Sequence, residues 1–195
     1  MLPAIFGFIG VIVGALITGL KEWFFRQRDE RQKGHYLAIR VCTMLDLFLY
    51  DCADVVLDDG YDHGGRDPNG YLSVQTRLPS LSFEDLDVDW QVLPSKLAYR
   101  VLNLPNRIQR AFRYVEGASE HATPPDFEEM FEARQDEFAK LGKEAADLAD
   151  ALREFAKLPD REKREWDPME FILKRLDDIG RREKQTAAFW AANDV

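Results

Sequence analysis

Cysteine and histidine are scarce in this chain, which contains 2 cysteines and 3 histidines among its 195 residues. Cys42 and Cys52 lie ten positions apart in one predicted helix, about 15 Å along its axis, so they cannot bond to each other. No histidine has a second histidine or a cysteine at the spacing of zinc ligands. The composition argues against a disulfide framework and a tetrahedral zinc site, and it predicts no metal and no cofactor.

One loop does collect oxygen-bearing side chains. Its members are Asp58, Asp59, Asp62, His63, Asp67 and Asn69. Their spacing does not follow the calcium-binding pattern of an EF-hand, and Asp and Asn are also ordinary turn residues. A solvated loop is the favoured interpretation, and a weak metal site at Asp58, Asp62 and His63 stays open.

Recognisable catalytic motifs are also lacking. The chain has no G-x-S-x-G, no P-loop, no G-x-G-x-x-G and no H-E-x-x-H, and no serine has a recognisable histidine partner. The interpretation is therefore that the protein is not an enzyme. An unrecognised active site around Asp62 and His63 is the alternative.

Basic residues are outnumbered by acidic ones, 26 against 35, which gives a net charge of −9. From residue 41 onward, 20 Lys and Arg face 32 Asp and Glu. Nucleic-acid-binding proteins usually present a basic face, so the charge argues against nucleic acid as a partner. The same acidic surplus would hold the body of the protein away from anionic lipid.

Only one long run of the chain, residues 2–20, is free of charged side chains. At 1.5 Å per residue it spans about 28 Å, the thickness of one hydrocarbon core. A cleaved signal peptide is the competing interpretation, but no basic residue precedes the run and no A-x-A cleavage site is evident before Lys21. The sequence therefore predicts a retained transmembrane helix in contact with the lipid bilayer.

A basic and aromatic flank follows this run. Its members are Lys21, Trp23, Arg26, Arg28, Arg31 and Lys33. Aromatic side chains favour the membrane interface, and flanks rich in Lys and Arg stay on the cytoplasmic side. The expected topology is a single-pass protein of the cell membrane, the inner membrane of a bacterium, with the N-terminus outside and the C-terminal domain cytoplasmic.

Small residues recur on one face of the predicted transmembrane helix. Gly7, Gly10, Gly14 and Thr18 make up this face, and Gly10 and Gly14 form a G-x-x-x-G. Such spacing lets two helix backbones approach closely in lipid. We expect the helix to pack on a second copy of itself or on a partner helix. The alternative is that membrane helices simply tolerate glycine.

Apolar side chains recur every three to four residues after residue 35, which predicts amphipathic helices. We expect helices over 21–58, 95–117, 123–158 and from 167, with Ser95, Thr123 and Asp167 as N-terminal start signals and Gly34 as a joint. On the apolar stripe of the third predicted helix, which ends at Phe155, only Arg134 is out of pattern.

The expected fold is all-α, with the transmembrane helix continuing into a bundle of about four helices. The expected division is a transmembrane helix (1–20), a juxtamembrane helix (21–34), a cytoplasmic bundle (35–190) and a tail (191–195).

Residues 59–94 interrupt the helices with a long loop insertion, in which 71–78 alternate like a short strand. An acidic stretch ends this loop, and several arginines follow on the next helix. Together they form the candidate partner surface: Glu84, Asp85, Asp87, Asp89, Trp90, Arg100, Arg107 and Arg110.

These features predict a membrane-anchored, non-enzymatic helical interaction or scaffold module at the cytoplasmic face of the membrane. Its expected partners are a second copy of the chain, an unidentified protein, or both. The alternative is an oligomerising membrane effector that perturbs the bilayer and is regulated by its helical domain.

Overall fold

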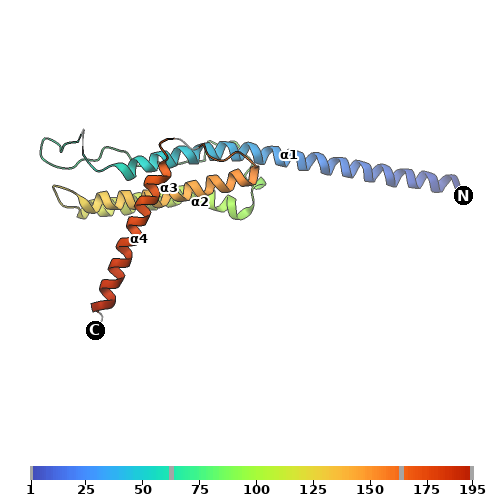
Figure 1. The fold of residues 1–195 in the computed structure, drawn as a ribbon. Helices are drawn as coiled ribbons and strands as arrows, with labels where there is room; N and C mark the ends of the chain where they lie inside the picture. Colours follow the sequence, from blue (N-terminus) through green and yellow to red (C-terminus); the bar gives the residue numbers. More distant parts are fainter. Residues whose placement is uncertain (1, 62–63, 163–164, 194–195) are drawn as a thin grey trace.

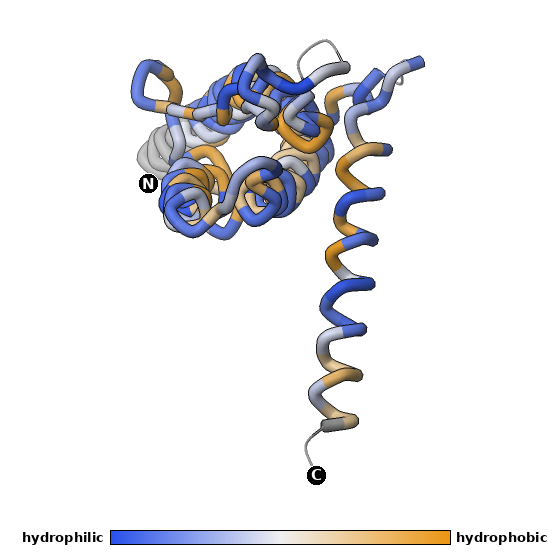
Figure 2. Tube along the Cα trace, turned by 90° about the vertical axis from the view of Figure 1, so that its left-hand side faces the viewer, coloured by the Kyte–Doolittle hydropathy of each residue, from blue (hydrophilic) through white to orange (hydrophobic). Residues whose placement is uncertain are grey.

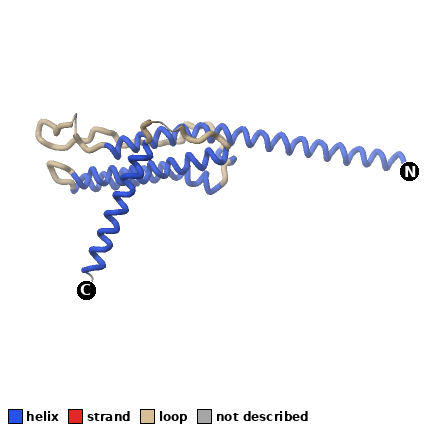
Figure 3. The backbone as a smooth tube through the Cα atoms, viewed as in Figure 1, coloured by secondary structure: helices blue, strands red, loops and turns tan. Residues whose placement is uncertain are grey.

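The computed structural model describes residues 2–61, 64–162 and 165–193, with the backbone alone for residues 2–18 and for residue 193. Its elements, in chain order, are α1 (Leu2–Leu57), the short 3₁₀ helix η1 (Trp90–Val92), α2 (Ser95–His121), α3 (Glu128–Ala156) and α4 (Pro168–Asn193). Figure 3 shows helices joined by loops, without a strand in the described part of the chain. The all-α prediction is confirmed.

Helix α1 is a single uninterrupted helix of 56 residues that extends far beyond the other helices (Figure 1). The predicted joint at Gly34 is therefore wrong. Gly34 is buried, and a Cβ placed there would lie 3.2 Å from the Phe155 ring of α3. The glycine allows a close approach between two helices, and the helical hydrogen bonds continue through it.

Helix α3 is the centre of the fold, because it contacts α1, α2 and α4. The predicted apolar stripes of the first three helices face one another around it. Their buried members are Leu37, Val41, Phe48, Cys52, Val55, Val101, Leu104, Ile108, Ala111, Val115, Phe131, Phe138, Leu141, Ala145, Leu148 and Leu152. The helical periodicity thus identified these core residues correctly. Of the other predicted stripe members, Phe155 is 38% exposed, and Met44, Leu97 and Ala118 are only partly buried. The fully buried Leu45 and Leu49 of α1 were not on the predicted stripe.

Helices α1 and α2 run in the same direction, and α3 runs back between their ends (Figure 1). Residue Val92, just before α2, lies near Gly34 of α1 at one end of the bundle. Gly60, just after α1, lies near Phe131 of α3 at the other end. The chain must therefore return along the whole bundle between α1 and α2, which explains why the connection is so long.

This connection is a strap that packs on the bundle. Phe83 and Leu93 are buried in the core, and other apolar strap residues pack partly against it. The Phe83 and Trp90 rings meet edge to face, with centroids 5.7 Å apart. The expected short strand over 71–78 is wrong, because these residues pair with α3 and with turns and form no ladder with a second strand within the described residues.

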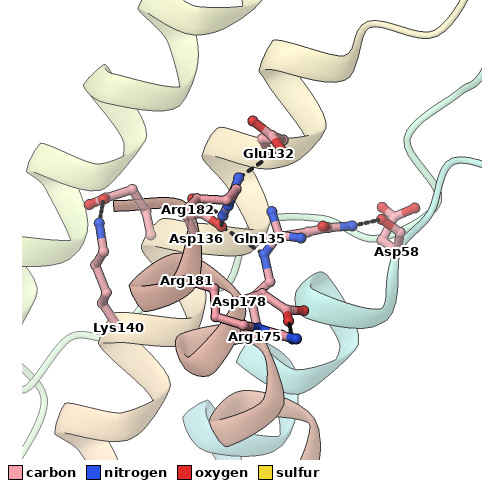
Figure 4. A network of polar contacts seen from close by, with 10 residues as sticks. Asp58, Glu132, Gln135, Asp136, Lys140, Arg175, Asp178, Arg181 and Arg182 are labelled. Atoms are coloured by element: carbon pink, nitrogen blue, oxygen red, sulfur yellow. Dashed lines mark hydrogen bonds and ion pairs between the residues drawn. The ribbon is translucent and has the colours of Figure 1, made fainter. Parts of the chain in front are cut away.

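Helix α4 crosses the other three helices steeply, and its C-terminal half leaves the bundle (Figures 1 and 2). Ion pairs hold its first half on α3, as Figure 4 shows. Asp136 of α3 accepts from Arg175 at 2.7 Å and from Arg182 at 2.7 Å. The N-cap prediction at Asp167 is confirmed, since its carboxylate accepts the backbone N–H of Met169 at 3.0 Å. The helix runs to Asn193, into the predicted tail.

The second helix begins at Ser95 as predicted, but Ser95 is not its N-cap. Ser95 is already helical, and the carbonyl of Pro94 accepts the first backbone N–H groups of α2. The predicted start of the third helix is wrong. Helix α3 begins at Glu128 and not near Thr123. Pro124 precedes a second proline, and a residue before proline is disfavoured in the helical conformation. The second helix also passes through Gly117 to His121.

In the part of the chain that the structure describes, no helix combines the length and the apolar character needed to cross a membrane. The predicted transmembrane helix at 2–20 gains no support from this finding. The side chains of Gly7, Gly10, Gly14 and Thr18 lie outside the described residues. The expected packing face of this helix stays a prediction.

A test of the packing compares two glycines. A Cβ at Gly142 of α3 would lie 3.0 Å from Cys52 Cβ of α1 and would also meet Ile172 of α4, whereas a Cβ at Gly117 meets nothing within 4 Å. Gly142→Ala should be less stable than Gly117→Ala by about 1–3 kcal/mol, because crowding opposes the gain in helix propensity that both share. Urea unfolding followed by circular dichroism measures both. Equal stabilisation by the two substitutions would contradict this packing.

Candidate functional site

The N-terminal part of α1 lies outside the bundle, and the first buried residue among those described is Gly34. At 1.5 Å per residue, the helix preceding it is about 48 Å long. Leu20, Trp23, Phe24 and Phe25 are between 57% and 69% exposed. The predicted basic flank is exposed as well, and within it Lys33 pairs with Asp29 at 2.8 Å. We call residues 2–33 the arm.

A groove of about 800 Å³ lies where the arm enters the bundle. One helical face of α1 supplies one wall, and the C-terminal end of α3 supplies the other. The lining residues are Arg28, Arg31, Gln32, His35, Tyr36 and Ile39 from α1, and Phe155, Ala156 and Lys157 from the end of α3. The α1 members are spaced by three, one, three, one and three residues, so they form one stripe along the helix.

Three local contacts shape this groove. The close approach at Gly34 brings the Phe155 ring against α1. The His35 side chain makes a hydrogen bond at 3.1 Å from Nδ1 to the carbonyl oxygen of Ala156. Lys157 ends α3 in the left-handed conformation, at φ 52°, and its backbone N–H donates to the last turn of the helix. The two walls are therefore tied together at the point where α3 stops.

Both walls of the groove combine cationic and apolar side chains. Arg28, Arg31 and Lys157 make no ion pair with any described residue, and none of the described residues that line the groove is acidic. Tyr36 and Ile39 are exposed apolar surfaces here. Arg40 donates to the Tyr36 hydroxyl at 2.8 Å. The arrangement is suited to an anion that also carries apolar or ring-shaped parts.

A smaller cavity of about 400 Å³ adjoins the groove at Ile39. It contains the ion pair between Asp46 of α1 and Arg153 of α3. Cys42 also lines it, and its thiol donates to the carbonyl of Ala149 at 3.4 Å. Burial raises the pKa of Cys42 to about 11, so the thiol is protonated at neutral pH. Burial also raises the pKa of Cys52. The thiolate is the nucleophilic form of cysteine, so neither side chain is activated for chemistry.

The oxygen-rich loop has a structural role at Asp58. Its buried carboxylate accepts from the backbone N–H groups of Gly60, Gln75 and Thr76 and from Arg134 at 3.1 Å. Asp62 and His63 lie outside the described residues. Among the residues that the structure does describe, no three His, Cys, Asp or Glu side chains are placed to hold a metal ion.

Arg134 is the buried partner of the Asp58 carboxylate, and this pair was not predicted from the sequence. It is buried on the core stripe of α3, and it also donates to the carbonyl of Thr76 at 2.6 Å. Burial lowers the pKa of Arg134, and the Asp58 carboxylate opposes that shift. The signal was present in the sequence, because a charged residue on an apolar stripe requires a buried partner of opposite charge.

The candidate partner surface is divided between two places. Its acidic residues are exposed on the strap, where Asp89 accepts from the backbone N–H of Gln91 and Trp90 is half-buried. On α2, Arg107 pairs with Glu144 of α3 at 2.5 Å. Arg110 lines a depression with Arg107 between α2 and α3, and Arg100 is exposed. Arg28 and Arg31 of the predicted flank do come together with other residues, in the groove.

The groove itself was not predicted. Its residues from the bundle, His35, Tyr36, Ile39, Phe155 and Lys157, belong to segments more than a hundred residues apart. Comparison with known proteins gives no relative: no family model matches the chain, and no curated protein or solved structure is significantly similar to it.

The protonated state of the buried thiols can be tested by alkylation. At pH 7.5 iodoacetamide should leave Cys42 and Cys52 of the folded protein unmodified, because a raised pKa keeps the thiolate fraction small. Modification of Cys42 should increase as the pH approaches 11. Mass spectrometry counts the adducts, and the same reaction in urea is the control that should modify both. Complete modification of the folded protein at pH 7.5 would contradict the assignment.

Proposed function

We propose that the protein is a membrane-anchored interaction module, with the arm of α1 as its anchor and the helical bundle as its cytoplasmic domain. The observation that carries the proposal is the arm: a helix about 48 Å long that leaves the bundle and has no other described element beside it. A helix that packs on no other element is only marginally stable in water. An apolar helix is stable in a bilayer, because its backbone hydrogen bonds are internal and its side chains contact lipid.

Side-chain chemistry along the arm supports the same proposal. Residues 2–20 carry no charge, and the exposed Trp23, Phe24 and Phe25 follow at the position of an interfacial aromatic belt. Arginines and a lysine come next, which favours the cytoplasmic side for the bundle. An exposed aromatic cluster in water would be unfavourable by roughly 25 cal/mol per Å² of apolar surface.

The bundle then serves as the part that contacts other molecules. Anchoring restricts it to a thin layer beside the membrane, which raises its effective concentration toward other membrane-bound partners. The steeply crossing α4 and the acidic strap both present exposed side chains to the cytoplasm in this arrangement. The small-residue face of residues 7–18 supports self-association as one mode of contact.

Fractionation of cells that express the full chain tests the anchor. We expect the protein in the membrane fraction after washing with alkaline carbonate, which removes peripheral proteins. Deletion of residues 2–20 should move it to the soluble fraction with its thermal unfolding unchanged, because the core begins after residue 33. Deletion of residues 183–193, which spares the ion pairs of Arg182 with α3, is the matched control and should leave the protein in the membrane. A wild-type protein released by carbonate would refute the proposal.

Self-association is tested by the mass of the purified protein in mild detergent. The double substitution Gly10→Ile and Gly14→Ile should dissociate the oligomer, because bulky side chains separate the two backbones. Ile12→Phe adds bulk on the opposite side of the helix and should leave the mass unchanged. A monomeric wild type would remove self-association from the proposal and leave the anchor intact. Leakage of vesicles by the wild-type oligomer would favour a bilayer-perturbing effector instead.

A further inference from the structure

We infer that the groove between α1 and the end of α3 binds the headgroup of an anionic phospholipid from the cytoplasmic leaflet. The inference rests on the proposed function for the source of the ligand, since it places the groove beside a membrane. It goes further in assigning a specific lipid-binding site to residues of the bundle.

The first argument is charge. The chain is acidic overall, and about half of the described basic side chains of the bundle are paired with carboxylates. In the groove Arg28, Arg31 and Lys157 have no such partner among the described residues, and no acidic side chain lines it. Of the two acidic residues between Arg28 and Arg31, Asp29 is engaged by Lys33, and neither Asp29 nor Glu30 lines the groove. A phosphate is the natural counter-ion for these cations, and arginine binds it in a bidentate manner.

The second argument is position along α1. If Trp23, Phe24 and Phe25 lie at the interface, Arg28 follows Phe25 by about 4–5 Å and Arg31 by about 9 Å. The headgroup layer is about 5–8 Å thick on each side of the hydrocarbon. Side chains on a helix tilt toward its N-terminus, so both guanidinium groups reach back toward the bilayer. A lipid phosphate therefore comes within their range while its acyl chains stay in the membrane.

The third argument is the second wall, which the end of α3 supplies and which adds a third cation to the two arginines of α1. Lys157 comes from the end of α3 and not from the basic flank, so the positive-inside signal alone does not account for it. The partly exposed rings of Tyr36 and Phe155 line the same groove, so apolar surface lies beside the cations. The groove thus has two walls from different helices, and this distinguishes it from the surface of a single basic helix.

The test uses the full chain reconstituted in phosphatidylcholine vesicles, with spin-labelled phosphatidylglycerol or spin-labelled phosphatidylcholine as the probe. Electron paramagnetic resonance measures the fraction of each probe held by the protein. We expect the wild type to hold phosphatidylglycerol at least about threefold more strongly. Arg31→Gln with Lys157→Gln should reduce this preference to nearly none.

The matched control is Lys96→Gln with Arg100→Gln. It removes two charges at the same end of the bundle but outside the groove, and it should keep the preference. Equal losses in the two variants would overturn the inference, because general electrostatic attraction would then explain the preference. Displacement of the lipid by millimolar inorganic phosphate would also overturn it, in favour of a site for free anions.

The outcomes also separate the inference from the proposed function. A chain that enters vesicles but shows no preference between the two probes refutes the lipid site alone. A chain that fails to enter vesicles refutes the anchor, and with it the membrane as the source of the ligand.

Discussion

The buried pair of Asp58 and Arg134 determines where the chain turns at the far end of the bundle. A carboxylate removed from water needs a full set of partners, and Asp58 has three backbone N–H groups in addition to the guanidinium. These bonds join the end of α1, the first half of the strap and the N-terminal part of α3. Displacing any one of these three segments would remove partners from a buried charge.

The length of the strap follows from the direction of α2. Because α2 runs parallel to α1, the chain has to travel back along the bundle before α2 can begin. The strap does so with apolar residues against the core and acidic residues toward solvent. A segment that resembles an insertion in the sequence is therefore part of the packing, and its acidic stretch over residues 84–89 lies on its outer surface.

The groove arises because α1 and α3 end at different places. Helix α3 stops at Ala156, beside residues 34–36 of α1, and α1 continues for more than thirty residues without a neighbour among the described elements. The stripe of α1 that lines the groove, from Arg28 to Ile39, is exposed, whereas Gly34, Leu37 and Ala38 beside it are buried. A partly covered stripe with unpaired cations is thus a direct consequence of the difference in helix length.

The sequence by itself determined the helices, the apolar stripes and most of the core, because a period of 3.6 residues is a local property that each segment carries alone. It also identified the cap at Asp167. The start of α2 was predicted correctly, but its N-cap and the start of α3 were misjudged, because Ser95 and Thr123 resemble caps whatever the chain does next. Only the tertiary structure decided the partner of Arg134, the role of the strap and the groove. Each depends on contacts between residues such as His35 and Ala156, 121 positions apart, whose meeting follows from the directions of whole helices and from no local pattern.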